Sequence, residues 1–75
     1  MKVGDLVLRK IPNKDKDFYL WNESKRQRRE LGHGIVLSKQ MAGSNPVHPC
    51  ITVLYPRTGQ MYDIAESLME VISEA

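Results

Sequence analysis

The chain has 75 residues, a formal net charge of +2 from 11 basic and 9 acidic residues, and one cysteine. This length predicts one small domain, residues 1–75, and the single cysteine excludes an internal disulfide. The weak net charge does not by itself require a nucleic-acid partner, and no apolar stretch approaches the ~20 residues that span a bilayer. The first five residues lead into charge, so we expect no signal peptide and an intracellular protein that is neither secreted nor membrane-bound.

Short apolar runs of strand length follow one another along most of the chain. Residues 3–9 and 35–38 predict the first two strands, and residues 50–55 form the clearest strand pattern. Residues 56–59 read Pro-Arg-Thr-Gly and predict a hairpin turn before a fourth strand at residues 60–64. Residues 39–49 predict a loop, because they include Asn45, Pro46 and other residues that break strands.

Residues 10–31 interrupt this rhythm and predict a long first loop. A connection of this length in so small a domain is unusual and tends to be functional or to contain an element of its own. A short helical turn fits here, with Ser24 as its cap and Leu31 in contact with the core.

The C-terminal segment is compatible with two structures. Residues 65–73 predict a 3₁₀ turn followed by a closing strand. The alternative is a short helix over residues 64–74 packed on a β-sheet, since Ile64, Leu68, Val71 and Ile72 would share one helical face. We favour the strand because five short strands can close a barrel.

Several of these segments resemble the strands of SH3-like barrel domains. They are Val3-Gly4-Asp5-Leu6-Val7, Gly34-Ile35-Val36-Leu37, Ile51-Thr52-Val53-Leu54-Tyr55 and Glu66-Ser67-Leu68-Met69-Glu70-Val71-Ile72. The resemblance is closest to very small barrels encoded by tailed bacteriophages, including phages of marine bacteria and cyanophages. It implies an all-β, five-stranded SH3-like barrel with a long first loop, located in the host cytoplasm or in the virion. It transfers no site residue to this chain.

Catalysis and metal binding have little support in the sequence. His48 and Cys50 are close enough to meet on a strand, but Pro49 intervenes and no third orienting group is evident. One cysteine and two histidines do not supply the paired ligands of a zinc site. We expect no enzyme activity, catalytic residue, metal or cofactor.

Nucleic-acid binding is the first of two serious hypotheses. Arginine and lysine bind phosphates, and Tyr19 and Trp21 could stack on bases. Acidic residues are interleaved with the basic ones, so the alternative is a solvated loop of paired charges. The candidate residues are Lys14, Lys16, Lys25, Arg26, Arg28, Arg29 and Arg57.

Protein binding is the second hypothesis, and we favour it slightly because the net charge is small. Aromatic side chains are typical anchors of protein interfaces, although these rings could also cover the barrel mouth. The expected partner is a larger phage structural protein or a host factor, and self-association stays open. The candidate residues are Phe18, Tyr19, Trp21, Arg26, Arg28 and Arg29.

Overall fold

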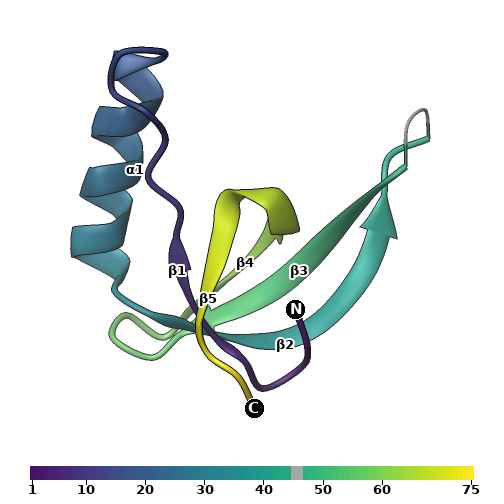
Figure 1. Ribbon diagram of the computed structural model, residues 1–75. Coiled ribbons are helices and arrows are strands. Elements are labelled where there is room, and N and C mark those ends of the chain that lie inside the picture. Colours follow the sequence, from purple (N-terminus) through teal and green to yellow (C-terminus); the bar gives the residue numbers. More distant parts are fainter. Residues whose placement is uncertain (45–46) are drawn as a thin grey trace.

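The computed structural model describes residues 1–44 and 47–75. Within these residues the chain forms five strands, one long helix and one 3₁₀ turn (Figure 1). In chain order they are β1 (Leu6–Arg9), α1 (Phe18–Leu31), β2 (Gly34–Ala42), β3 (His48–Tyr55), β4 (Gln60–Ala65), η1 (Glu66–Leu68) and β5 (Met69–Ser73). The expectation of a small, mainly β domain is therefore confirmed.

All five strands belong to one antiparallel sheet with the order β4-β3-β2-β1-β5. Register shifts between Leu6 and Val7 and between Val36 and Ser38 bend this sheet. The bend does not join its edges, because no ladder links β4 to β5 among the described residues. The sheet is open, which corrects the expectation of a closed barrel.

The predicted loop at residues 10–31 is mostly helix. The Asp17 carboxylate caps α1 by accepting a hydrogen bond from the Leu20 amide at 2.9 Å, and Gly32 ends the helix with a φ of 68°. Ser24, predicted as the cap, instead lies inside the helix with only 1% of its surface exposed. The predicted contact of Leu31 with the core is confirmed.

The C-terminal segment forms the predicted turn and strand, whereas the first strand, predicted over residues 3–9, begins only at Leu6. The 3₁₀ turn η1 leads into β5, which pairs with β1 through Leu8↔Glu70 and Arg9↔Met69. The alternative of a helix over residues 64–74 is wrong, because the backbone of β5 takes its hydrogen bonds from β1.

The second predicted loop, at residues 39–49, is shorter than expected. Strand β2 continues to Ala42 and β3 begins at His48, where the two residues pair with each other. Backbone pairing can continue where the side chains are polar and exposed, so an apolar pattern is not required there. The predicted breakers Asn45 and Pro46 lie outside the described residues.

The core takes residues from β1, β2, β3 and β5. Six buried side chains form it: Val7, Val36, Ile51, Val53, Tyr55 and Met69. Within β3, Ile51, Val53 and Tyr55 alternate with partly exposed residues, as a strand with one buried face requires.

A buried carboxylate links the two ends of the described chain. Asp5 is 1% exposed, and its side chain accepts hydrogen bonds from the amides of Lys2 and Ala75 at 2.8 Å each. The bond from Ala75, followed by that from Lys2, lowers the pKa of Asp5 below its ordinary value of 3.8, because both bonds favour the ionised form.

We expect acid to destabilise the domain through Asp5. Since its pKa is lower in the folded than in the unfolded state, its contribution is complete above about pH 4 and disappears as the pH falls through the folded-state pKa. Asp5→Asn should lower Tm by several degrees at pH 7 and flatten the dependence of Tm on pH below 4. Circular dichroism melts from pH 7 to pH 2 measure both effects. The exposed Asp15→Asn is the control, and an acid slope that Asp5→Asn leaves unchanged contradicts the assignment.

Candidate functional site

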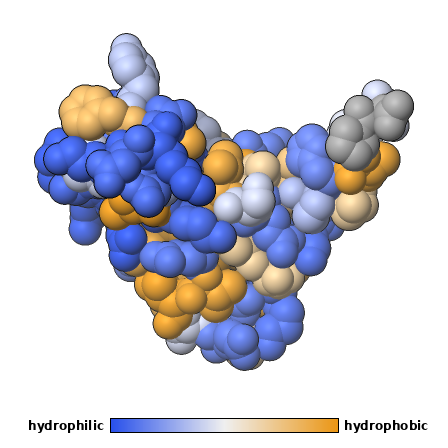
Figure 2. All heavy atoms as spheres, turned by 45° about the horizontal axis from the view of Figure 1, so that its top comes forward, coloured by the Kyte–Doolittle hydropathy of each residue, from blue (hydrophilic) through white to orange (hydrophobic). Residues whose placement is uncertain are grey.

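Helix α1 stands beside the sheet, and its first turn lies away from the strands (Figure 1). It packs mainly against β1, with Ser24 and Leu31 on the packed side. The helix side of the molecule is predominantly hydrophilic, with hydrophobic side chains interrupting it (Figure 2). A helix held along one side leaves its remaining surface available for contact with another molecule.

The aromatic side chains predicted as anchors lie on the first turn of α1 but differ in exposure. Phe18 is 59% exposed and Tyr19 is 86% exposed, whereas Trp21 is half-buried. The rings of Phe18 and Trp21 lie 5.6 Å apart between centroids, at 32° to one another. Sequence reasoning could not rank these rings, because their exposure depends on which face of the helix meets the sheet.

Trp21 is already in contact with two cations. The ammonium groups of Lys14 and Lys25 lie 4.9 Å and 4.6 Å from its ring centroid. Each such contact contributes roughly 0.5–1 kcal/mol at an exposed site. The indole therefore joins the segment before the helix to the helix itself, and it is less available than Tyr19 for stacking on a ligand.

The arginines of the predicted basic run mostly have acidic partners. Arg26 pairs with Glu23 and, at 3.1 Å, with Glu30, and its hydrogen bond to Glu23 lowers the pKa of that carboxyl group. Arg28 pairs with Glu70 of β5 at 3.2 Å. These ion pairs neutralise much of the positive charge that the sequence places between residues 25 and 29.

Arg57 supports the far end of the helix. Its Nη1 atom donates a hydrogen bond to the backbone oxygen of Arg29 at 2.7 Å. A cation at this position satisfies a terminal carbonyl and complements the negative end of the helix dipole. The seven candidates for nucleic-acid binding thus do not form one patch, although Lys14, Lys16, Lys25 and Arg29 are exposed and have no acidic partner among the described residues.

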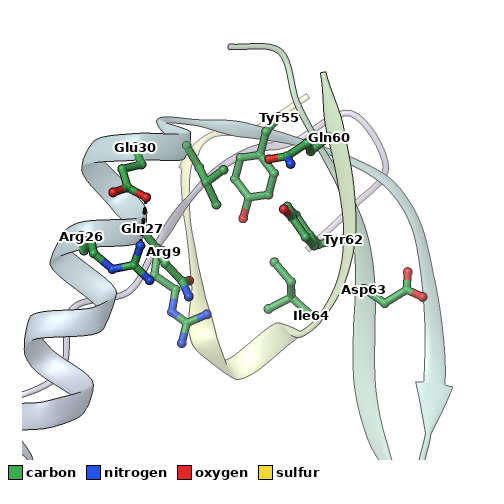
Figure 3. A pocket seen from close by; sticks show the side chains of 10 residues that line it. Arg9, Arg26, Gln27, Glu30, Tyr55, Gln60, Tyr62, Asp63 and Ile64 are labelled. Atoms are coloured by element: carbon green, nitrogen blue, oxygen red, sulfur yellow. Dashed lines mark hydrogen bonds and ion pairs between the residues drawn. The ribbon is translucent and has the colours of Figure 1, made fainter. Parts of the chain in front are cut away.

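A groove that sequence reasoning missed lies between α1 and β4 (Figure 3). Its volume is about 370 Å³. The lining includes Arg9, Gln27, Leu31, Tyr55, Tyr62 and Ile64. The predicted hairpin held a signal for this groove. Alternate residues of paired strands share a face, and in the hairpin Val53 pairs with Tyr62 and Tyr55 pairs with Gln60.

The described residues contain no group of three His, Cys, Asp or Glu side chains placed to hold a metal ion. His48 is exposed at the start of β3, and Cys50, two residues later, is half-buried. Within the same residues no helix is long and apolar enough to cross a bilayer.

Comparison with protein-family models, with curated proteins and with solved structures finds no match to this chain. The resemblance to small phage-encoded SH3-like barrels therefore stays a prediction. Two surface features are available for binding: the exposed first turn of α1 and the groove between the later turns of α1 and β4.

Proposed function

We propose that this chain is a non-enzymatic binding module that docks on another protein through the first turn of α1. The exposure of Phe18 and Tyr19 carries the proposal. Two neighbouring aromatic side chains, 59% and 86% exposed, stand on a helix whose cap and ion pairs hold it in place. Aromatic residues on an ordered helix lose little further entropy on binding, which makes them effective anchors.

The surrounding charges indicate the chemistry of the partner. Lys14, Lys16 and Lys25 are exposed around the first turn, and the acids of the helix are occupied by Arg26. An apolar pocket with an acidic rim complements this arrangement and would speed association. Of the predicted arginines, Arg26 and Arg28 already have partners within the domain, and Arg29 lies in the last turn of α1, away from this contact.

An open variant of the SH3-like barrel is the frame that we propose for this module. The strand order β4-β3-β2-β1-β5 and a 3₁₀ turn before the last strand are compatible with such a frame. On this proposal α1 replaces a long first loop and presents the binding residues. A phage structural protein or a host factor is the partner that the sequence resemblance would imply.

Nucleic-acid binding is the second candidate, favoured by the exposed Lys14, Lys16, Lys25 and Arg29, which have no acidic partner in the described part of the chain. Phosphate binding by these side chains would weaken steeply as salt increases. Fluorescence anisotropy with a short DNA and a short RNA at low ionic strength tests this candidate. Absence of binding at low salt rejects it.

Site-specific cross-linking tests the docking surface. Tyr19 is replaced by the photoreactive amino acid benzoylphenylalanine, and the chain is expressed in the cell in which it naturally occurs. We expect one discrete protein adduct after irradiation, because Tyr19 lies at the most exposed point of the proposed contact. Mass spectrometry identifies the adduct, and an adduct with a second copy of the chain would assign the surface to self-association.

Position 58 is the control, because Thr58 is exposed on the β3–β4 turn, at the other end of α1. The same photoreactive amino acid there should give no adduct with that protein. Phe18→Ala in the Tyr19-labelled chain should reduce the adduct at least about tenfold, as loss of a central aromatic anchor does, while circular dichroism stays unchanged. Equal adducts from positions 19 and 58, or none from position 19, reject the proposal.

A further inference from the structure

The groove between α1 and β4 has a distinct chemical character. Figure 3 shows Arg9 on the helix side of the groove and Tyr55 and Tyr62 on the opposite side. Leu31 and Ile64 add apolar surface between these polar groups. The groove can therefore hold a ligand that has an apolar part and a group able to bind a guanidinium.

Arg9 has no ion-pair partner among the described residues. Its Nε atom is buried from solvent and makes no hydrogen bond with any described residue, and no ion pair involves this guanidinium in the same residues. A buried donor without an acceptor is unfavourable, because it has lost its hydrogen bond to water. Because Nε itself is closed to solvent, a ligand in the groove would reach this guanidinium through its Nη atoms and supply a counter-charge there.

The nearby acids do not fill this role. The carboxylates of Glu23 and Glu30 bind Arg26, although the charge of Arg9 also contributes to the lowered pKa of Glu23. Asp63 also lines the groove, but its carboxylate is turned outward (Figure 3) and accepts a hydrogen bond from the Thr52 hydroxyl at 2.6 Å. A carboxylate from outside can therefore approach Arg9 without displacing an acid from it.

The free edge of β4 borders the same groove. In the described part of the chain, strand β4 pairs with β3 alone and ends the sheet, and its residues 60–63 are all exposed. Gln60, Tyr62 and Ile64 turn their side chains into the groove (Figure 3). An unpaired edge offers backbone donors and acceptors to an added strand, whose alternate side chains would then face the groove.

We propose that this groove binds an extended acidic peptide segment of another protein, which adds a strand to the free edge of β4 and places a carboxylate on Arg9. A carboxylate offers two oxygens to a guanidinium in a bidentate geometry. The six residues of β4 and a volume of about 370 Å³ suit a short strand better than a single small anion. The site is separate from the first turn of α1, so either proposal can fail alone.

Titration of the ¹⁵N-labelled chain with a peptide tests the proposal. The probe is Thr-Val-Glu-Val-Thr-Val, acetylated at its N-terminus and amidated at its C-terminus, so that glutamate is its only charge. We expect chemical-shift changes at the amides of residues 60–65 and at the Arg9 Nε–H. Replacing the glutamate with glutamine should raise Kd at least about tenfold, as loss of a charge-assisted hydrogen bond does.

Protein variants separate Arg9 from general electrostatics. Arg9→Gln should raise Kd for the glutamate peptide at least about tenfold. Lys10→Gln removes the same charge from an exposed neighbouring residue and should change Kd less than about twofold, because exposed charges are well screened. If Arg9→Gln fails to fold, the glutamine peptide on the unchanged protein provides the same comparison.

Two further ligands distinguish strand addition from binding of a bare anion. Two peptides, each methylated on one of the two alternating sets of amide nitrogens, should differ in affinity. Methylation of the amides that face β4 should abolish binding, and methylation of the other set should leave it intact. Sodium acetate should shift the Arg9 signal only weakly and leave the β4 amides unchanged. The proposal is overturned if both methylated peptides bind equally well, if acetate reproduces the peptide shifts, or if the glutamate peptide does not bind at millimolar concentration.

Discussion

Gly34→Ala is expected to lower the free energy of unfolding by about 2–3 kcal/mol, as other substitutions that overfill a core do. Gly34 is buried at the start of β2, where it pairs with Val7 of β1. A Cβ atom at this position would overlap the Cγ1 atom of Val53 and would lie 3.3 Å from the backbone oxygen of Leu54. The φ of Gly34 is not positive, so the penalty comes from lack of space and not from backbone strain.

A double-mutant cycle with Val53→Ala tests this explanation by urea denaturation. Val53→Ala removes the methyl group that a new Cβ would strike, so Gly34→Ala should cost clearly less in that background. We expect a coupling free energy of about 1–2 kcal/mol, within the range found for residues in direct contact. Additive effects of the two substitutions would show that the close approach of β2 and β3 does not explain the glycine.

The strand framework could be predicted from the sequence because each strand has its own local pattern. Alternation in β3 and the Pro56–Gly59 turn placed the central hairpin within one or two residues. The long helix was not predicted, because residues 18–31 do not form an apolar stripe wide enough to indicate an amphipathic helix. Asp17 and Gly32 mark the two ends of this helix, but they act as its N-cap and C-cap only once the helix between them has formed.

The sequence could not show which of the predicted binding residues have partners within the fold. Arg28 meets Glu70, and Arg57 meets the backbone of Arg29, so both contacts join segments far apart in the chain. Such pairs decide which charges remain available, and they exist only once α1 has packed beside the sheet. Arg9 was overlooked for the same reason, since only the fold sets it in a groove opposite Tyr55.

Met69→Ala is expected to lower the free energy of unfolding by about 2–5 kcal/mol, as other truncations of buried side chains do. Met69 opens β5, is 2% exposed and belongs to the core. A domain of 75 residues typically has a total stability of about 4–11 kcal/mol. The variant should therefore unfold at much lower urea concentration, and it could be largely unfolded at 37 °C.

Ile72→Ala is the matched control because it truncates an apolar side chain of similar size on the same strand. Ile72 is 49% exposed, so its loss should cost less than about 1 kcal/mol. A helix over residues 64–74 would reverse this order, since its apolar face would comprise Ile64, Leu68, Val71 and Ile72. Leu68 and Val71 are 36% and 38% exposed in the strand structure, which makes Met69 the apolar anchor of this segment. An Ile72 substitution more damaging than the Met69 substitution would contradict the pairing of β5 with β1.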